Sequence, residues 1–316
     1  MVPRHHAGHH ETMPLIPPMQ RYYFALAIAI AGTVSACSVC RFQPAPVLQE
    51  QSEIALTVAA EPRGAFLVIH GLNQRPTSMN PLCEYLRTLG FHTYRITLRG
   101  HDELSESAFS SEEWERDVLN GYATLRSRFP DLPINVAGYS LGGLLATKTL
   151  DSYPEFSPNR MILFAPGLSF RSLVQSGYLL QILPPLTIGL PNLSPTDYKR
   201  FKDTPLFWYQ NIFTLYTGTR DLTHPRRLRD TPTIIFLNPT DELVSLSGTE
   251  YWIEDNQLAQ SWTVIPVHRT PLQPFMAEHI VIDERSLGFT EWERVKGIIR
   301  EFVMPRNTKP IGPRSF

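Results

Sequence analysis

Short, largely apolar runs recur along the chain and are separated by segments with helical spacing. Such runs, bounded by glycine, proline or polar residues, are typical of strands buried on both faces of a parallel sheet. After a weaker first strand near residues 54–58, they occupy residues 65–69, 91–96, 134–137, 161–164, 233–237 and 262–267.

Between these runs, apolar residues three or four positions apart indicate helices. In residues 112–129 the apolar face carries Trp114, Val118, Tyr122 and Leu125, and residues 289–303 show the same spacing. Strands that alternate with helices predict an α/β fold with a mostly parallel, doubly wound sheet.

One connection is far longer than the others. Residues 167–229 separate two predicted strands and are dense in apolar groups, with one cluster in residues 179–190 and another in residues 207–216. This length is far greater than that of a normal connection between secondary-structure elements. We therefore expect a helical cap, inserted after the sixth strand of a core formed by residues 53–166 and 230–304, with a C-terminal tail at residues 305–316. The apolar groups of the cap either line a lipid pocket or pack against the core.

The N-terminal region is typical of an export signal. Arg21 precedes an apolar stretch at residues 22–31, which is shorter than the roughly 20 residues a membrane-spanning helix needs and leads into small residues. The sequence Val34-Ser35-Ala36-Cys37 resembles the lipobox of bacterial lipoproteins. The resemblance implies that residues 1–36 are removed, starting from Met1, Met13 or Met19. It also implies that Cys37 becomes a lipid anchor and residues 37–52 a tether.

The lipobox resemblance sets an expected location. A lipid on Cys37 would hold the protein on a membrane of the bacterial cell envelope. Ser38 stands where retention in the inner membrane is commonly signalled by aspartate, so the outer membrane is preferred. Cleavage without lipidation would give a periplasmic or secreted protein instead.

Composition excludes several other classes. Among 316 residues, 42% are hydrophobic and the formal net charge is −1, so the chain has a substantial core and no feature that favours nucleic acid. Cys37 and Cys40 have zinc-like spacing, but no second pair exists, and Cys83 fits a buried, inert thiol. Neither a metal cluster nor a dinucleotide fingerprint is visible, so we expect no cofactor.

The candidate chemistry centres on Ser140. The sequence Gly138-Tyr139-Ser140-Leu141-Gly142 follows a predicted strand and opens a predicted helix, which is the context of a nucleophile elbow. Such a turn exposes the serine hydroxyl to a histidine base, and its glycines allow close backbone approach.

An acid and a base follow in the required order. Asp241 comes just after the strand at residues 233–237, and His279 lies in the loop after the strand at residues 262–267. The order Ser140, Asp241, His279 is that of α/β-hydrolases. Glu242 and Asp230 compete with Asp241 for the acid, although Asp230 precedes its strand. The histidine candidates that compete with His279 are His268 and, less directly, His70 and His101.

From about residue 50 to 304, the chain resembles α/β-hydrolases of the monoacylglycerol lipase, lysophospholipase and serine aminopeptidase type. The matching landmarks are His70-Gly71, Arg99-Gly100-His101, the serine elbow, Asp241-Glu242-Leu243-Val244 and His279. Asp102 stands where these relatives usually have glycine. The resemblance implies two-step acyl transfer by Ser140, His279 and Asp241, with an oxyanion hole formed by the backbone amides of Leu72 and Leu141.

The resemblance implies a serine carboxylic-ester hydrolase acting on monoacylglycerol, lysophospholipid or a similar ester. The cap has more basic than acidic residues between Gly167 and Arg220, which favours neutral or anionic substrates over peptides with a free amine. Two alternatives stay open: a serine aminopeptidase, and a catalytically silent lipoprotein of this fold that binds lipids or envelope partners. The sequence leaves the oligomeric state undetermined.

Overall fold

A computed structural model describes residues 51–102, 108–175, 184–269 and 278–304. Predicted features at residues 1–50, including Cys37, and at residues 305–316 lie outside these ranges, as does part of the first apolar cluster of the cap. Among the described residues, no helix has the length and apolar content needed to cross a bilayer.

The core is a seven-stranded sheet in the order β1-β3-β2-β4-β5-β8-β9. The short edge strand β1 pairs antiparallel with β3, and every other pair in this sheet is parallel. The predicted α/β fold with a mostly parallel sheet is therefore confirmed. The strands are β1 (Glu53–Ala55), β2 (Gly64–Ile69), β3 (Phe91–Ile96), β4 (Ile134–Tyr139), β5 (Met161–Phe164), β8 (Thr233–Leu237) and β9 (Trp262–Pro266).

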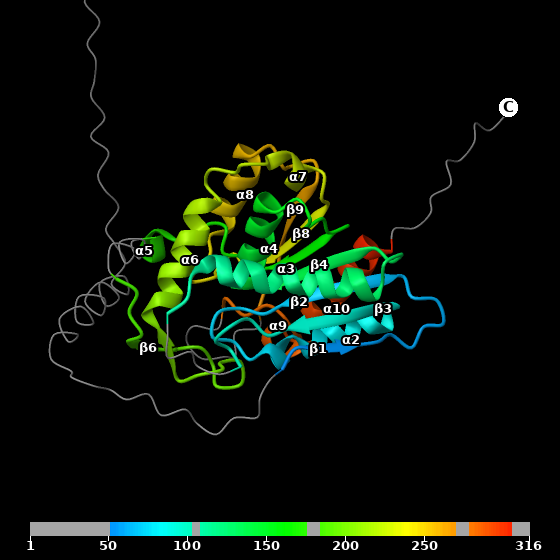
Figure 1. Cartoon of the computed structure of the whole chain (residues 1–316), viewed down its shortest axis with the longest axis horizontal. Helices are drawn as coiled ribbons and strands as arrows, with labels where there is room; N and C mark the ends of the chain where they lie inside the picture. The colour runs from blue at the N-terminus through cyan, green and yellow to red at the C-terminus, as the bar shows by residue number, and fades with distance from the viewer. Residues whose placement is uncertain (1–50, 103–107, 176–183, 270–277, 305–316) are drawn as a thin grey trace, which may run out of the picture. The chain divides into compact units, whose positions relative to one another are not determined.

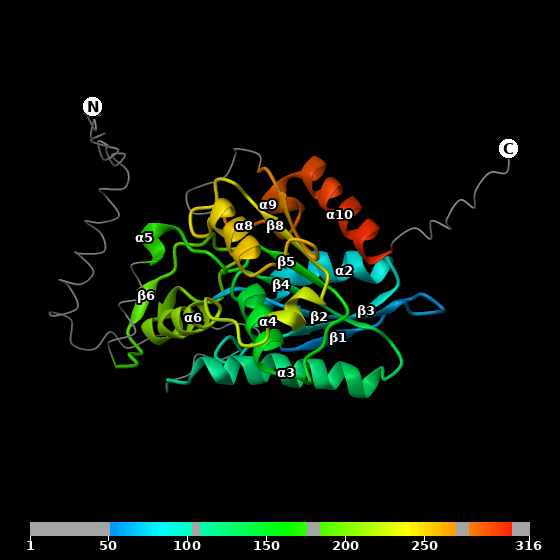
Figure 2. The same cartoon turned by 90° about the horizontal axis from the view of Figure 1, so that it is seen from above.

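The apolar runs become strands because both faces of the sheet are covered. All residues of β2, β4, β5 and β8 are buried, as expected for central parallel strands. Helices lie on both sides of the sheet, with α3 and α4 on one side and α2 and α10 on the other (Figures 1 and 2). Their bounds are α2 (Asn80–Thr88), α3 (Ser111–Arg128), α4 (Leu141–Ser152), α7 (Pro225–Arg229), α8 (Leu246–Asp255) and α10 (Phe289–Val303), with a short 3-10 helix η1 (Pro76–Met79) and α9 (Glu284–Leu287).

The long insertion follows β5, which is the fifth strand among the described residues and not the sixth that we expected. Its described part is also only partly helical. It contains α5 (Ser172–Gln175), the antiparallel pair β6 (Gly189–Pro191) and β7 (Asp203–Pro205), and α6 (Leu206–Gly218). These cap elements lie together at one end of the sheet (Figures 1 and 2), whereas α7, at the end of the insertion, packs on α4.

Candidate active site

Ser140 occupies a sharp turn between β4 and α4. Its φ of 50° lies in the left-handed region, which is costly for a residue with a side chain. The turn also needs Gly142, because a Cβ there would lie 2.3 Å from the carbonyl oxygen of Ile69. This close packing fixes the elbow and leaves Ser140 partly exposed.

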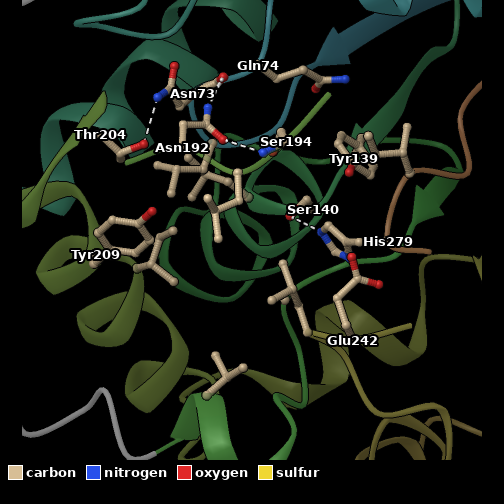
Figure 3. A pocket seen from close by; sticks show the side chains of 18 of the residues that line it. Asn73, Gln74, Tyr139, Ser140, Asn192, Ser194, Thr204, Tyr209, Glu242 and His279 are labelled. Atoms are coloured by element: carbon tan, nitrogen blue, oxygen red, sulfur yellow. Dashed lines mark hydrogen bonds between the residues drawn. The ribbon is translucent and has the colours of Figure 1, made fainter. Parts of the chain in front are cut away.

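The structure brings Ser140, His279 and Asp241 into one hydrogen-bonded chain. Figure 3 shows the link between Ser140 and His279. His279 Nε2 lies 2.7 Å from Ser140 Oγ, and His279 Nδ1 lies 2.7 Å from Asp241 Oδ2. Asp241 is fully buried, and its second oxygen accepts the N–H groups of Leu243 and Val244 at 2.8 and 2.9 Å. An ionised carboxylate only accepts hydrogen bonds, so Asp241 places the proton of neutral His279 on Nδ1 and leaves Nε2 to accept from serine.

The electrostatics of His279 are dominated by burial and by Asp241. Burial alone would lower the pKa of His279, but the charge and hydrogen bond of Asp241 outweigh it, so this pKa is raised above its usual 6.5. The pair therefore favours the imidazolium that a general base forms when it takes the serine proton.

The competing residues lie in other surroundings. Glu242 makes no hydrogen bond to His279, and Asp230 is exposed at the end of α7, before β8 begins. His268 is exposed, and its backbone N–H bonds to Glu291. None of the three takes part in the hydrogen-bonded chain with Ser140.

His70 and His101 support the loop before η1. The Nδ1–H of His70 donates to the carbonyl oxygen of Gly71 at 2.8 Å, while its Nε2 accepts the N–H of Leu98. Both histidines are fully buried, and burial lowers the pKa of His70 to about 4 and that of His101 well below 6.5. They are therefore neutral scaffolding groups near pH 7.

Two backbone amides are available near Ser140. Leu141 is the first residue of α4, so its N–H has no carbonyl partner within the helix. The N–H of Leu72 makes no hydrogen bond within the described part of the chain. The carbonyl of Gly71, in the same peptide unit as the Leu72 N–H, is held by His70 and by the N–H of Gln74. The backbone amides of Leu72 and Leu141 are thus available for the predicted oxyanion hole, which stays a prediction.

A family model described as "Serine aminopeptidase, S33", a hydrolase family, matches residues 60–260. The chain belongs to this family. It is an α/β-hydrolase of the monoacylglycerol lipase and serine aminopeptidase type.

Individual relatives share low sequence identity with this chain or match only part of it. A monoglyceride lipase homolog of Monkeypox virus is 22% identical over 219 residues, which cover 61% of this chain and 76% of the viral protein. A thermostable monoacylglycerol lipase of Bacillus sp. (strain H-257) is 30% identical over 93 residues, which cover 28% of this chain and 36% of that lipase. The crystal structure of a soluble variant of Saccharomyces cerevisiae monoglyceride lipase superposes with a TM-score of 0.65 at 14% identity, covering 80% of this chain and 90% of the yeast chain. This last likeness shows the fold.

The hydrolase has a cavity of about 270 Å³ at the serine. One part of its wall is apolar, and the other carries uncharged polar groups (Figure 3). The apolar wall includes Leu144, Phe170, Val174, Ile212 and Phe213; the polar wall includes Asn73, Gln74, Asn192, Ser194, Thr204 and Tyr209. Sequence reasoning missed the polar wall. The position of Asn73 and Gln74 just after His70-Gly71 was the one available signal, because no pattern marks Asn192 or Thr204.

Glu242 is the one formally charged residue among the described residues that line the cavity, apart from the titratable His279. Its carboxylate oxygens and the amide nitrogen of Gln74 are buried without hydrogen-bond partners in the described part of the chain. Burial raises the pKa of Glu242. Glu242 therefore keeps unused hydrogen-bonding capacity in the wall beside His279.

The basic residues of the cap do not form a described part of the cavity wall. Arg171 donates to the backbone carbonyls of Asp241 and Pro239, Lys199 to that of Asn192, and Arg200 to those of His101 and Asp102. The guanidinium groups of Arg171 and Arg200 thus join the cap to the core, whereas Lys199 bonds within the cap. The basic balance of the cap sequence is therefore weak support for an anionic substrate.

The free cysteine of the described region is remote from this chemistry. Cys83 lies buried in α2, and burial raises its pKa to about 12. Its thiol is accordingly protonated near neutral pH, as expected for an unreactive core residue.

Proposed function

We propose that this α/β-hydrolase cleaves esters of apolar carboxylic acids with small uncharged alcohols, monoacylglycerols among them. The hydrogen-bonded chain from Ser140 through His279 to Asp241 carries the proposal. The apolar wall suits an acyl group, and the uncharged polar wall suits hydroxyl groups of the alcohol. The names of the viral, bacterial and yeast relatives point to the same class of ester.

The proposed reaction has two steps. Ser140 Oγ attacks the ester carbonyl carbon while His279 Nε2 takes the serine proton, and the amides of Leu72 and Leu141 bind the oxyanion. His279 then passes this proton to the departing alkoxide oxygen, which leaves an acyl group on Ser140. Water, activated by His279, releases the carboxylic acid and restores the serine hydroxyl.

A fluorophosphonate probe tests the serine directly. We expect rapid labelling of the wild-type protein and none of Ser140→Ala, together with release of fatty acid from monoacylglycerol by the wild type alone. An unlabelled wild-type protein would contradict the proposal and favour a catalytically silent hydrolase fold that binds lipids or envelope partners.

Glu242 supports a second candidate, a serine aminopeptidase. Its carboxylate has no hydrogen-bond partner in the described region and lines the cavity, where it would attract the free amine of a peptide. A panel of p-nitrophenyl esters and aminoacyl-anilides separates the two activities. Turnover of anilides that is lost in Glu242→Gln would favour the peptidase, whereas turnover of the esters alone supports the esterase.

We further propose that Cys37 carries a lipid that holds the enzyme at the bacterial cell envelope. The lipobox-like sequence Val34-Ser35-Ala36-Cys37 supports this proposal. Cys37→Ser, or treatment with globomycin, should leave an uncleaved precursor. Processing that is unchanged in both cases would instead indicate ordinary signal cleavage and a periplasmic or secreted enzyme.

A further inference from the structure

One short stretch of the cap contacts both loops that the chemistry needs. We call residues 197–204 the buttress segment and residues 70–75 the oxyanion loop. Their backbones are joined by two hydrogen bonds, from Arg75 N to the carbonyl of Tyr198 at 2.7 Å and from Arg200 N to the carbonyl of Asn73 at 2.9 Å. Between these bonds, Gln74 and Lys199 form a β-bridge.

Asn73 is the centre of this junction. It is 2% exposed, directly follows Leu72, and has a φ of 44°. Its side-chain oxygen accepts the N–H of Phe201 at 2.8 Å. Its amide nitrogen lies 2.6 Å from Thr204 Oγ1 and 3.1 Å from the carbonyl of Asp203. An asparagine that uses both ends of its amide on the cap resists displacement of the oxyanion loop.

His101 adds a second route from the cap to the same loop. Its Nε2 accepts the backbone N–H of Asn73 at 3.0 Å. The cap holds His101 in turn, because Trp208 stacks on its ring at 4.4 Å and Arg200 Nε donates to its carbonyl at 2.7 Å. The peptide unit just after Leu72 is therefore held through backbone and side-chain contacts.

The buttress segment also reaches the loop that carries His279. The hydroxyl of Tyr198 donates to Asp283, with Oδ1 at 2.9 Å and Oδ2 at 3.1 Å, and Asp197 pairs with Arg285. Asp283 caps α9, and residues 280–282, which connect it to His279, are buried. A shift of Tyr198 would thus be transmitted to the catalytic histidine through a tightly packed connection.

We propose that the buttress segment aligns the oxyanion loop with His279, and that Asn73 and Tyr198 are positioning residues for acyl transfer. This inference rests on the proposed function. Catalytic groups displaced by about 1 Å can lose about 100-fold in rate. The cap therefore contributes to the geometry of the transition state in addition to shaping the cavity.

Asn73→Gly tests the first contact. Glycine tolerates the φ of 44°, so this variant removes the side-chain bonds to the cap without new backbone strain. We expect kcat, normalised to the sites that a fluorophosphonate labels, to fall roughly 10- to 100-fold with KM within about threefold. Affinity for an aryl trifluoromethyl ketone, which forms an oxyanion with Ser140, should fall in parallel.

Tyr198→Phe tests the second contact against a matched control. Tyr122→Phe also removes one buried hydroxyl that bonds to a distant residue, the carbonyl of Ser157 at 2.6 Å, but it lies on α3 away from the cavity. We expect kcat to fall roughly 3- to 10-fold in Tyr198→Phe and to stay at the wild-type value in Tyr122→Phe.

The outcomes separate this inference from the proposed function. If the wild-type protein reacts with the fluorophosphonate but Asn73→Gly keeps kcat and ketone affinity, the alignment role is wrong and the esterase stands. A rise in KM at unchanged kcat would likewise overturn it, because the segment would then shape only the cavity. If kcat falls equally in Tyr198→Phe and Tyr122→Phe, Tyr198 only stabilises the fold and is not a positioning residue.

Discussion

At the scale of single residues, the role proposed for His279 depends on its burial, its charge and its two hydrogen bonds. His279 is 7% exposed, shares one side of its ring with a fully buried carboxylate and faces the serine with the other. A histidine that acts as a base here needs one fixed tautomer, and its positive charge must be stabilised during the reaction. The hydrogen bond to Asp241 fixes the tautomer, and the negative charge of Asp241 stabilises the imidazolium. His268, although also in the region after β9, has neither contact.

Replacing the two histidines separately distinguishes their roles. His279→Ala should lower kcat/KM for an ester by about 10⁴-fold or more, because the serine loses its base. His268→Ala should keep kcat/KM within about threefold of the wild-type value. Steady-state kinetics on a p-nitrophenyl ester measures both, and the opposite ranking would reassign the base to His268.

The pH profile should report the same base. Only neutral His279 accepts the serine proton, so kcat/KM should rise with pH through the pKa of free His279, which lies above its usual 6.5. In Asp241→Asn the cause of the rise is removed, so the limb should move to lower pH while the maximal rate falls. A wild-type limb below pH 6.5 would contradict this account.

At the scale of elements, the serine elbow needs glycine because the neighbouring backbone leaves no room for a Cβ atom. Gly138 and Gly142 face backbone atoms across the turn, and an added Cβ at Gly138 would lie 2.6 Å from the carbonyl oxygen of Gly142. Backbone atoms cannot rotate away as side chains can. The glycine pattern therefore reports the close approach of β4, α4 and the end of β2.

A pair of glycine-to-alanine changes tests this reading. Gly142→Ala should lower the free energy of unfolding by roughly 3 kcal/mol, because its Cβ would meet the carbonyl oxygens of Ile69 and His70. Gly297→Ala, in α10 with no atom near its added Cβ, should raise it by roughly 0.5–1 kcal/mol through helix propensity. Urea unfolding of both variants checks the difference; equal effects would show that elbow packing is not the cause.

The element boundaries show where sequence patterns suffice. The apolar runs at residues 161–164 and 233–237 coincide with β5 and β8, and residues 289–303 coincide with α10. A continuous apolar run marks each of these strands, and helical spacing of apolar residues marks the helix. The first strand was wrong in extent: β1 ends at Ala55. This edge strand takes its length from pairing with β3, and that pairing ends at Ala55. Leu56, Thr57 and Val58 continue the alternation of apolar and polar residues beyond that point, so the sequence does not signal where the pairing stops.

At the scale of the whole molecule, two buried titratable groups, His70 and Glu115, change the stability of the fold in opposite directions as pH rises. The folded-state pKa of His70 is lowered to about 4, so folding gains stability as pH rises from about 4 to 6.5. Glu115, 5% exposed in α3, behaves in the opposite way. Burial raises its pKa from 4.5 to about 7, so stability is lost as pH rises through that window.

Glu115→Gln should reveal this balance. The nearby charged groups are Glu112 on the same helix and Lys148 and Asp151 on α4, and they remain in the variant. The measured quantity is the free energy of unfolding of the variant minus that of the wild type. This difference should increase by roughly 3 kcal/mol between pH 4.5 and pH 8. Denaturant unfolding across this range measures it, with Glu84→Gln on the exposed face of α2 as the control. Parallel curves for wild type and Glu115→Gln would contradict the role of burial.

The sequence by itself determined the fold class, the elbow and the order of serine, acid and histidine. These features rest on local periodicity, local glycine and the rule that parallel strands end at one edge of a sheet. Only the tertiary structure decided that His279 pairs with Asp241 beside Glu242, that cap arginines bond to backbone carbonyls, and that Asn73 joins the oxyanion loop to residues 201–204. Those contacts link positions far apart along the chain, so no local pattern encodes them. Packing of the cap on the core creates them.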